Sequence, residues 1–310
     1  MSNYPTTYGE FAKWFQDDAS CYAYLFQIRW PEGFICPRCA ERKYWLGRSD
    51  LYRCHKCLFK SSITAGTIFQ DRKKPLLQWF HAAWHITENK HGISACGLQK
   101  ALGLGSYHTA WSWLHKFRIA MVRPHRDKLC GEMEVDEIYI GGEKPGKRGR
   151  GAEGKELVLI VAEKNGKHIG RIRLIHIKDA KMSTLSMALK SVAEAGATFY
   201  TDGWAGYSTR HLKALGYNHV VVRTNAHLGD NLLPHANIIS SLLKRWLLGT
   251  LQGGIQATHL SYYLDEFTFR FNRRTSKARG MLFYRLLENA IAISPTIEAS
   301  LKGGKPPMAA

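Results

Sequence analysis

The sequence predicts a multidomain α+β protein, in which a small cysteine-rich module and a helical segment precede a domain built around a β-sheet. Three observations lead to this fold class: a length of 310 residues, two pairs of closely spaced cysteines, and a change from helical to strand-like patterning near Glu132. A chain of this length has room for about two domains. Its 45% hydrophobic and 22% charged residues are typical of a globular protein and exclude a mostly disordered chain.

The net charge of the chain is strongly positive, +19, from 44 Lys and Arg residues against 25 Asp and Glu residues. Both halves carry the excess, which favours a polyanion contacted along the molecule, with nucleic acid as the first candidate. A basic enzyme without such a partner and a membrane-surface protein are the alternatives. Because the chain has neither a long apolar run nor a basic-then-apolar leader, we expect a soluble protein of the cytosol.

Four of the seven cysteines form two CxxC pairs, whose spacing predicts a zinc site. Each CxxC makes a tight turn that directs two thiolates to one point, and two such turns supply a tetrahedral Zn²⁺ site. A pair of disulfides and a redox CxxC are the alternatives, but nothing indicates an oxidising compartment, and a redox motif needs no second pair. We therefore expect one structural zinc ion, in a zinc ribbon, bound by Cys36, Cys39, Cys54 and Cys57.

Two predicted helices after the ribbon have the pattern of a helix-turn-helix motif. A short helix from Ala95 to Leu102 precedes a glycine turn, and Ser106 caps a second helix that runs to about Met121. In such a motif the second helix reads the major groove of DNA. Plain packing of a helical hairpin is the alternative, because the exposed face is only mildly basic. The residues expected to face DNA are Tyr107, His108, Ser112, Lys116 and Arg118.

The second half of the chain has the order of elements of a ribonuclease-H-like domain. That fold has three consecutive strands, a helix, a fourth strand and a later helix, and the same succession follows from the patterning here. Strands are expected at 132–140, 157–163, 170–177 and 198–201, with a helix at 182–195.

Two aspartates occupy neighbouring places in this predicted sheet. Asp136 lies in the middle of the first strand, and Asp202 ends the fourth strand beside it. Two carboxylates brought together repel each other unless a cation lies between them, so a divalent metal ion is the simplest explanation of the pair. Two unrelated surface aspartates are the alternative.

A basic, glycine-rich loop follows the first strand. It is expected to be either a solvated hairpin tip or an arm that follows the DNA backbone. The residues assigned to DNA in the second case are Lys147, Arg148 and Arg150.

Six motifs occur in one order: CPRC…CHKC, GISACGLQKALGLGSYHTAWSWLHKFRIAM, EVDEIYIGG, YTDGWAGY, SLLKRWLLGT and YYLDEFTFRFNRR. Over roughly residues 15–290 they resemble the insertion-sequence transposases that join a zinc ribbon to a DDE-type catalytic domain, the ISXO-like group. The resemblance implies a ribonuclease-H-like catalytic domain, two Mg²⁺ ions, and cut-and-join chemistry on the ends of an element. It also implies terminal-repeat and target DNA as partners, assembly on DNA as a homodimer or larger oligomer, and a cytoplasmic, nucleoid-associated location in a prokaryote.

The resemblance also implies which residues form the active site. Asp136 of EVDE and Asp202 of YTDGW match the two acidic positions, and the third position, five residues before LLKR, holds Asn237. An amide oxygen can ligate Mg²⁺ but brings no charge, so we expect the second ion to be held more weakly. His235 and Glu134, the latter on the same strand face as Asp136, are the alternative ligands.

Two basic residues follow the third position on the same predicted helix. Lys244 lies seven residues after Asn237, which is two turns along one helix face, where it could contact the DNA backbone together with Arg245. A solvated lysine is the alternative.

The predicted function is a metal-dependent DNA transposase. The alternatives are a nuclease of the same fold that cuts without rejoining, and a transposase-derived DNA-binding protein with weak or no catalysis, which Asn237 would favour. The predicted segments are 1–70 for the N-terminal helix and zinc ribbon, 71–130 for the helix-turn-helix, 131–295 for the catalytic domain and 296–310 for a flexible tail.

Overall fold

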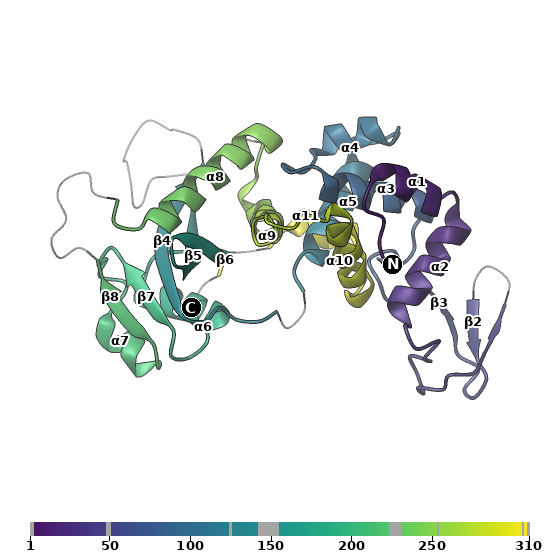
Figure 1. Ribbon diagram of the computed structural model, residues 1–310, viewed down its shortest axis with the longest axis horizontal. Helices are drawn as coiled ribbons and strands as arrows, with labels where there is room; N and C mark the ends of the chain where they lie inside the picture. The colour runs from purple at the N-terminus through teal and green to yellow at the C-terminus, as the bar shows by residue number, and fades with distance from the viewer. Residues whose placement is uncertain are drawn as a thin grey trace. The chain divides into compact units, whose positions relative to one another are not determined.

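The computed structural model describes residues 3–47, 51–123, 126–141, 155–222, 231–252, 254–305 and 307–308. The chain divides into two compact units, Met1–Pro124 with Ser276–Lys302, and His125–Thr275 with Gly303–Ala310. Figure 1 labels the elements of both units. Among the helices that the structure describes, none is both long and apolar enough to cross a bilayer.

The first unit is mainly helical and has an aromatic core. Phe11 packs on Trp84 with ring centroids 4.8 Å apart, and Phe15 packs on Phe80 at 4.9 Å. Phe283, from the far end of the sequence, lies 5.7 Å from Phe80. The helices of this unit are α1 (Tyr8–Trp14), α2 (Asp18–Arg29), α3 (Leu76–Glu88), α4 (Ala95–Ala101), α5 (Tyr107–Ala120), α10 (Arg279–Ala292) and α11 (Glu298–Gly303).

The C-terminal helices differ from the arrangement expected from the sequence. The predicted catalytic domain extends to residue 295, whereas α10 packs with α2, α3 and α5 in the first unit. The apolar stripe of α10 predicts burial but carries no information about which core it enters. In the predicted flexible tail, α11 forms instead, with Leu301 fully buried. The division into functional domains stays a prediction.

The cysteine-rich module contains a three-stranded antiparallel sheet in the order β1–β2–β3. On its inner face, Tyr52 packs against the rings of Phe26, Trp30 and Phe34. A small sheet of this kind has little core of its own, so a metal site is a common second source of stability. The strands are β1 (Tyr44–Leu46), β2 (Leu51–Cys54) and β3 (Lys60–Ser62).

The second unit is built on a five-stranded mixed sheet in the order β6–β5–β4–β7–β8. Strands β4, β5 and β6 form an antiparallel meander, and β7 and β8 add in parallel to β4 after the helical crossover through α6. This is the ribonuclease-H-like arrangement that the sequence predicts. The elements are β4 (Glu132–Ile140), β5 (Glu156–Asn165), β6 (His168–Ile177), α6 (Met182–Val192), β7 (Thr198–Thr201), α7 (Thr209–Ala214), β8 (Asn218–Val221), α8 (Pro234–Leu251) and α9 (Leu260–Phe271).

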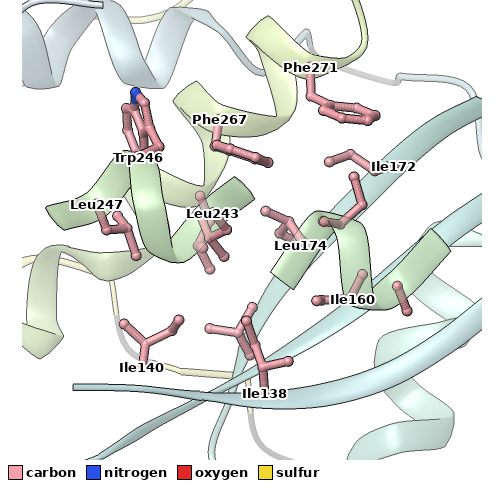
Figure 2. Packing of buried hydrophobic residues seen from close by; sticks show 14 of the residues in the cluster. Ile138, Ile140, Ile160, Ile172, Leu174, Leu243, Trp246, Leu247, Phe267 and Phe271 are labelled. Atoms are coloured by element: carbon pink, nitrogen blue, oxygen red, sulfur yellow. The ribbon is translucent and has the colours of Figure 1, made fainter. Parts of the chain in front are cut away.

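Helices cover both faces of this sheet because its strands are apolar on both sides. Alternate residues of β4 enter different cores: Ile138 and Ile140 pack against α8 and α9, whereas Met133 and Val135 pack toward α6. Figure 2 shows side chains of α8, including Leu243, directed at the isoleucines of the strands. The sheet is therefore fixed between two layers, which gives its polar edge a rigid support.

We expect Leu243→Ala to lower the free energy of unfolding of the second unit by about 2–5 kcal/mol, because a fully buried leucine leaves a cavity. The matched control is Leu248→Ala on the same helix, where the side chain is 67% exposed and the expected change is within about 0.5 kcal/mol. Urea unfolding of both variants measures the difference, and equal stabilities would contradict the assignment of this core.

Candidate functional site

The register of the parallel pair β4–β7 bears on the position of the two predicted aspartates. Glu134 lies opposite Tyr200, and continuing both strands by two residues would place Asp136 opposite Asp202. Side chains two residues apart lie on the same face of a strand, and neighbouring strands are about 4.8 Å apart. Asp202 follows the last residue of β7, Thr201, so the register places it near Asp136 if the pairing continues past its last pair, Glu134 with Tyr200. A shared site of the two aspartates stays a prediction.

The local contacts of both carboxylates are to backbone amides. Asp136 Oδ1 accepts a hydrogen bond from the amide of Glu137, and Asp202 Oδ1 accepts one from the amide of Trp204, both at 2.9 Å. Gly203, with φ of 84°, makes the turn that brings the Trp204 amide back to the carboxylate. Both aspartates are half-buried.

The pKa of the Tyr207 phenol depends on both aspartates. Burial raises the pKa of its phenol well above the ordinary value, and the negative charges of Glu137, Asp136 and Asp202 raise this pKa further. The phenol is therefore within electrostatic reach of both aspartates. At neutral pH this phenol stays protonated and able to donate a hydrogen bond.

Glu134 joins β4 to the beginning of α8. Its side chain is 3% exposed, and its Oε2 accepts hydrogen bonds from the amides of His235 at 2.7 Å and Ala236 at 3.0 Å. The residue before the helix, Leu233, provides no side-chain cap, so the carboxylate of β4 caps the helix instead. A buried carboxylate is stabilised there by the unpaired N–H groups and the positive end of the helix dipole.

Asn237 lies in the first turn of α8, directly after the residues that Glu134 caps, and its side chain is exposed. Its amide nitrogen donates to Asn231 Oδ1 at 2.5 Å. The amide oxygen, which is the atom that binds metal ions, is not part of this contact. Because Glu134 and Asp136 share a strand face, the same cap holds Asn237 at the edge that carries the aspartates.

The alternative ligands, Glu134 and His235, contact each other. His235 Nδ1 lies 3.5 Å from Glu134 Oε1, and both side chains are almost completely buried. With one oxygen used by two amides and the other facing an imidazole, Glu134 is arranged as a helix cap. The choice of Asn237 as the third ligand stays a prediction.

A cavity of about 550 Å³ lies on the second unit, with Tyr139 and Trp204 in its wall. Three basic residues, Lys155, Lys178 and Lys181, line it together with two acidic ones, Glu156 and Asp179. Asp179 pairs with Lys181 at 3.8 Å, so the lining carries both signs of charge.

The four predicted zinc ligands form one cluster. All four Sγ atoms lie within 4.8 Å of one another, with Cys36 to Cys57 at 3.6 Å and Cys39 to Cys54 at 3.5 Å. A tetrahedral site with Zn–S bonds of about 2.3 Å requires sulfur atoms about 3.8 Å apart. The cluster can therefore hold one zinc ion, as the sequence predicts.

The predicted DNA-reading helix, α5, is present but largely covered. Ser106 caps it as expected, through a hydrogen bond to the amide of His108. The structure differs from the expectation at Ser112 and Arg118, which are buried at 8% and 2% exposure, and at Lys116, whose ammonium lies over the ring of Trp79. Burial lowers the pKa of Lys116.

Only the first turn of α5 presents predicted contact residues to solvent. Tyr107 is 49% exposed, and His108 pairs with Glu298 of α11 at 2.8 Å. The physical reason is that α3, α4 and α10 all pack on α5, which the helix pattern alone does not reveal. A DNA-reading role for these five residues stays a prediction.

Of the remaining residues predicted to contact DNA, the structure describes two. Lys244 and Arg245 are exposed on α8, two turns after Asn237. Lys147, Arg148 and Arg150 lie outside the described residues.

Two contributors to the site are assigned by the structure alone. The helix-capping role of Glu134 and the buried position of Tyr207 beside the aspartates had no unambiguous signal in the sequence. The position of Glu134, between Glu132 and Asp136 on the strand face that ends in Ile138 and Ile140, is the signal that could have pointed to it.

Comparison with known proteins matches a segment of each unit to a transposase domain family. Residues 128–272 match the ISXO2-like transposase domain, and residues 16–58 match the transposase zinc-ribbon domain. The chain is 28% identical over 267 residues to an uncharacterized protein in transposable element ISH50 of Halobacterium salinarum, a match that covers 79% of this chain and 88% of the relative. The resemblance to zinc-ribbon insertion-sequence transposases is thereby confirmed.

We expect Cys54→Ser to lower the zinc content of the purified protein and to unfold the ribbon, because three sulfur ligands hold zinc less well than four. Cys96→Ser is the control, since Cys96 is exposed and outside the cluster. Metal analysis and thermal unfolding test both variants. Full zinc content in the Cys54 variant would show that the cluster is not the metal site.

We expect Glu134→Ala to lower the free energy of unfolding by about 1–3 kcal/mol, because it leaves two buried amides without an acceptor. Glu134→Gln keeps an acceptor oxygen and should cost less. The control is Glu132→Ala on the same strand, where the side chain is 54% exposed and the expected cost is at most about 1 kcal/mol. Urea unfolding that ranks Glu132→Ala above Glu134→Ala would refute the capping role.

Proposed function

We propose that the chain is a DNA transposase that binds the ends of an insertion sequence and performs Mg²⁺-dependent strand cleavage and strand transfer. The observation that carries this proposal is the parallel pairing of β4 with β7, which supports a shared site of Asp136 and Asp202 in a domain that matches transposases. A purely structural domain has no need of two adjacent carboxylates at a supported sheet edge, since their repulsion costs stability.

The residues at this edge fit a magnesium site. Carboxylate and amide oxygens are the ligands that Mg²⁺ takes from proteins, and Asp136, Asp202 and Asn237 provide them. Two Mg²⁺ ions bound there supply activation of the attacking water or 3′-hydroxyl and stabilisation of the departing oxygen. The two half-buried aspartates gain from a cation, because it removes their mutual repulsion.

The surrounding residues suit the substrate. Lys178 in the cavity that Trp204 lines, and Lys244 and Arg245 on α8, can neutralise phosphates of bound DNA. The protonated phenol of Tyr207 can hold a neighbouring carboxylate oriented by a hydrogen bond. Glu134 fixes the helix that carries the third ligand.

The partners and location follow from this assignment. The DNA partners are the terminal repeats of the element and the target, and cutting two ends requires at least two catalytic units, so we propose a homodimer or larger assembly on DNA. The positive net charge of +19 suits such an assembly. Such a protein would act in the cytoplasm of a prokaryotic cell, at the nucleoid.

One observation favours a second candidate, a transposase-derived DNA-binding protein with weak or no catalysis. Asn237 adds no charge to the site. Asp136 and Asp202 would therefore bind the metal ion more weakly than they would with a third carboxylate. The basic surface and the zinc cluster would serve this function equally well. Catalysis itself therefore has to be measured.

We expect Asp136→Ala and Asp202→Ala each to lower end cleavage by at least about 100-fold while DNA binding persists, because each removes a charged metal ligand. Asn237→Ala should lose much activity. Asn237→Asp should retain activity at lower Mg²⁺, since it keeps the oxygen and adds charge. The matched control is Glu132→Gln on β4, an exposed carboxylate that bonds the Tyr200 hydroxyl.

The assay uses labelled DNA that carries the ends of the element, titrated with Mg²⁺. Joined products support the transposase, nicks without joining favour a nuclease of the same fold, and shifted but intact DNA favours the DNA-binding protein. An Asn237→Ala enzyme with full rate and an unchanged metal requirement would place the third ligand elsewhere.

A further inference from the structure

The three-stranded sheet of the zinc ribbon has an outer face that the fold does not use. In its register, Trp45 lies opposite Arg53, and Arg53 lies opposite Lys60, so these three side chains form one row across β1, β2 and β3. Neighbours in such a row share a side of the sheet, about 4.8 Å apart. We call this row and the adjacent His55 the outer ribbon face.

The opposite face of the same sheet packs on the helical unit through its central strand. Tyr52, on β2, is buried and lies 5.2–5.7 Å from the rings of Phe26, Trp30 and Phe34. Because side chains alternate along a strand, this packing turns Arg53 outward on the same strand. The orientation of the outer ribbon face is therefore fixed by the core beneath it.

A large aromatic side chain on the edge strand of the outer ribbon face is half exposed to solvent. Trp45 is 46% exposed, its ring lies 4.3 Å from the imidazole of His55, and the guanidinium of Arg53 lies 5.8 Å from its centre. An indole exposed in this way does not gain the full free energy of burial. An aromatic ring beside a guanidinium is typical of surfaces that bind nucleic acid.

The charge around this face is mostly positive. Within the described residues from 36 to 62, Glu41 is the one acidic side chain, and its carboxylate accepts from the amides of Arg42 and Lys43. Among these same residues no basic side chain forms an ion pair. The exposed basic residues are Arg38, Arg42, Lys43, Arg53, Lys56 and Lys60.

The surface of α5 in the same unit is far less suited to binding DNA. The predicted reading helix α5 buries Ser112 and Arg118, and His108 is already paired with a carboxylate. The ribbon, by contrast, presents strands whose polar side chains point outward, and sheet-based DNA-binding proteins place such strands in a groove. The exposed basic side chains of the ribbon complement the phosphates of DNA, which favours duplex DNA over a protein as the partner of this face.

We propose that the outer ribbon face is the surface by which the first unit binds duplex DNA, with Trp45 against the groove and Arg53 and Lys60 on phosphates. The proposal rests on the proposed function for the identity of that DNA, the ends of the element. Cys54 follows Arg53 directly, so the metal cluster holds β2 in the orientation that DNA requires.

The test measures DNA binding by the full chain, using fluorescence anisotropy with an end duplex, an unrelated duplex and a single strand over a range of salt. We expect Arg53→Ala with Lys60→Ala to weaken duplex binding by at least about tenfold and to reduce the salt slope by about 2, one unit for each phosphate that is no longer neutralised. Trp45→Ala should weaken binding with an unchanged slope. DNA should also quench the emission of Trp45, measured as the difference from Trp45→Phe.

Two control pairs match these variants. Lys13→Ala with Lys90→Ala removes the same charge from exposed positions elsewhere in the unit and should leave affinity within about twofold, since distant charges are screened. Tyr107→Ala with His108→Ala tests the exposed end of α5. A zinc content equal to that of the unaltered chain shows that the ribbon of each variant is folded.

The outcomes separate this proposal from the proposed function. Suppose that the unaltered chain cleaves and joins ends, but that Arg53→Ala with Lys60→Ala (the ribbon pair) binds DNA as well as the Lys13/Lys90 pair does. The outer ribbon face is then not the DNA-binding surface, while the proposed transposase function stands. If the ribbon pair loses DNA binding in a chain that neither cleaves nor joins DNA, the ribbon surface stands and the transposase fails. A loss confined to the single strand, or a larger loss in the α5 pair than in the ribbon pair, would also overturn the proposal.

Discussion

A buried carboxylate between a strand and a helix organises the second unit. Glu134 is almost fully enclosed, yet both amides that it accepts from belong to the first turn of α8. A charge in such a place is tolerated only because the helix terminus compensates it, so strand and helix have to meet at that point. Asp136, two residues along β4, and Asn237, one residue beyond the capped amides, are thereby held at the same edge.

Much of this arrangement could be predicted because it depends on local pattern and element order. Two CxxC pairs at short spacing predict one sulfur cluster, and the four sulfur atoms do converge. The strand-like pattern of EVDEIYIGG and the place of YTDGW after a helical crossover predict two neighbouring strands, and β4 and β7 do pair in parallel. Ser106 caps α5 as its position before an amphipathic run indicates.

The rest could not be predicted because it depends on which surfaces meet. The sequence of α5 shows one apolar stripe, and only the three-dimensional packing reveals that α3, α4 and α10 cover Ser112 and Arg118 as well. Residues of α10 have the same stripe as many core helices, and nothing local assigns Phe283 to the N-terminal aromatic core. A glutamate on a strand could equally be a metal ligand or a cap until its partners are known.

The most direct test of the account is to find where a divalent metal ion sits. Fe²⁺ can replace Mg²⁺ at oxygen sites, and with ascorbate and peroxide it cuts the chain near its binding place, which mass spectrometry maps. The account predicts cuts in three segments distant in sequence, around Asp136, around Asp202 and at the start of α8. These cuts should vanish when both aspartates are replaced by alanine and persist in Glu132→Gln. Cuts that stay unchanged in the double variant, or that avoid β4 and β7, would contradict it.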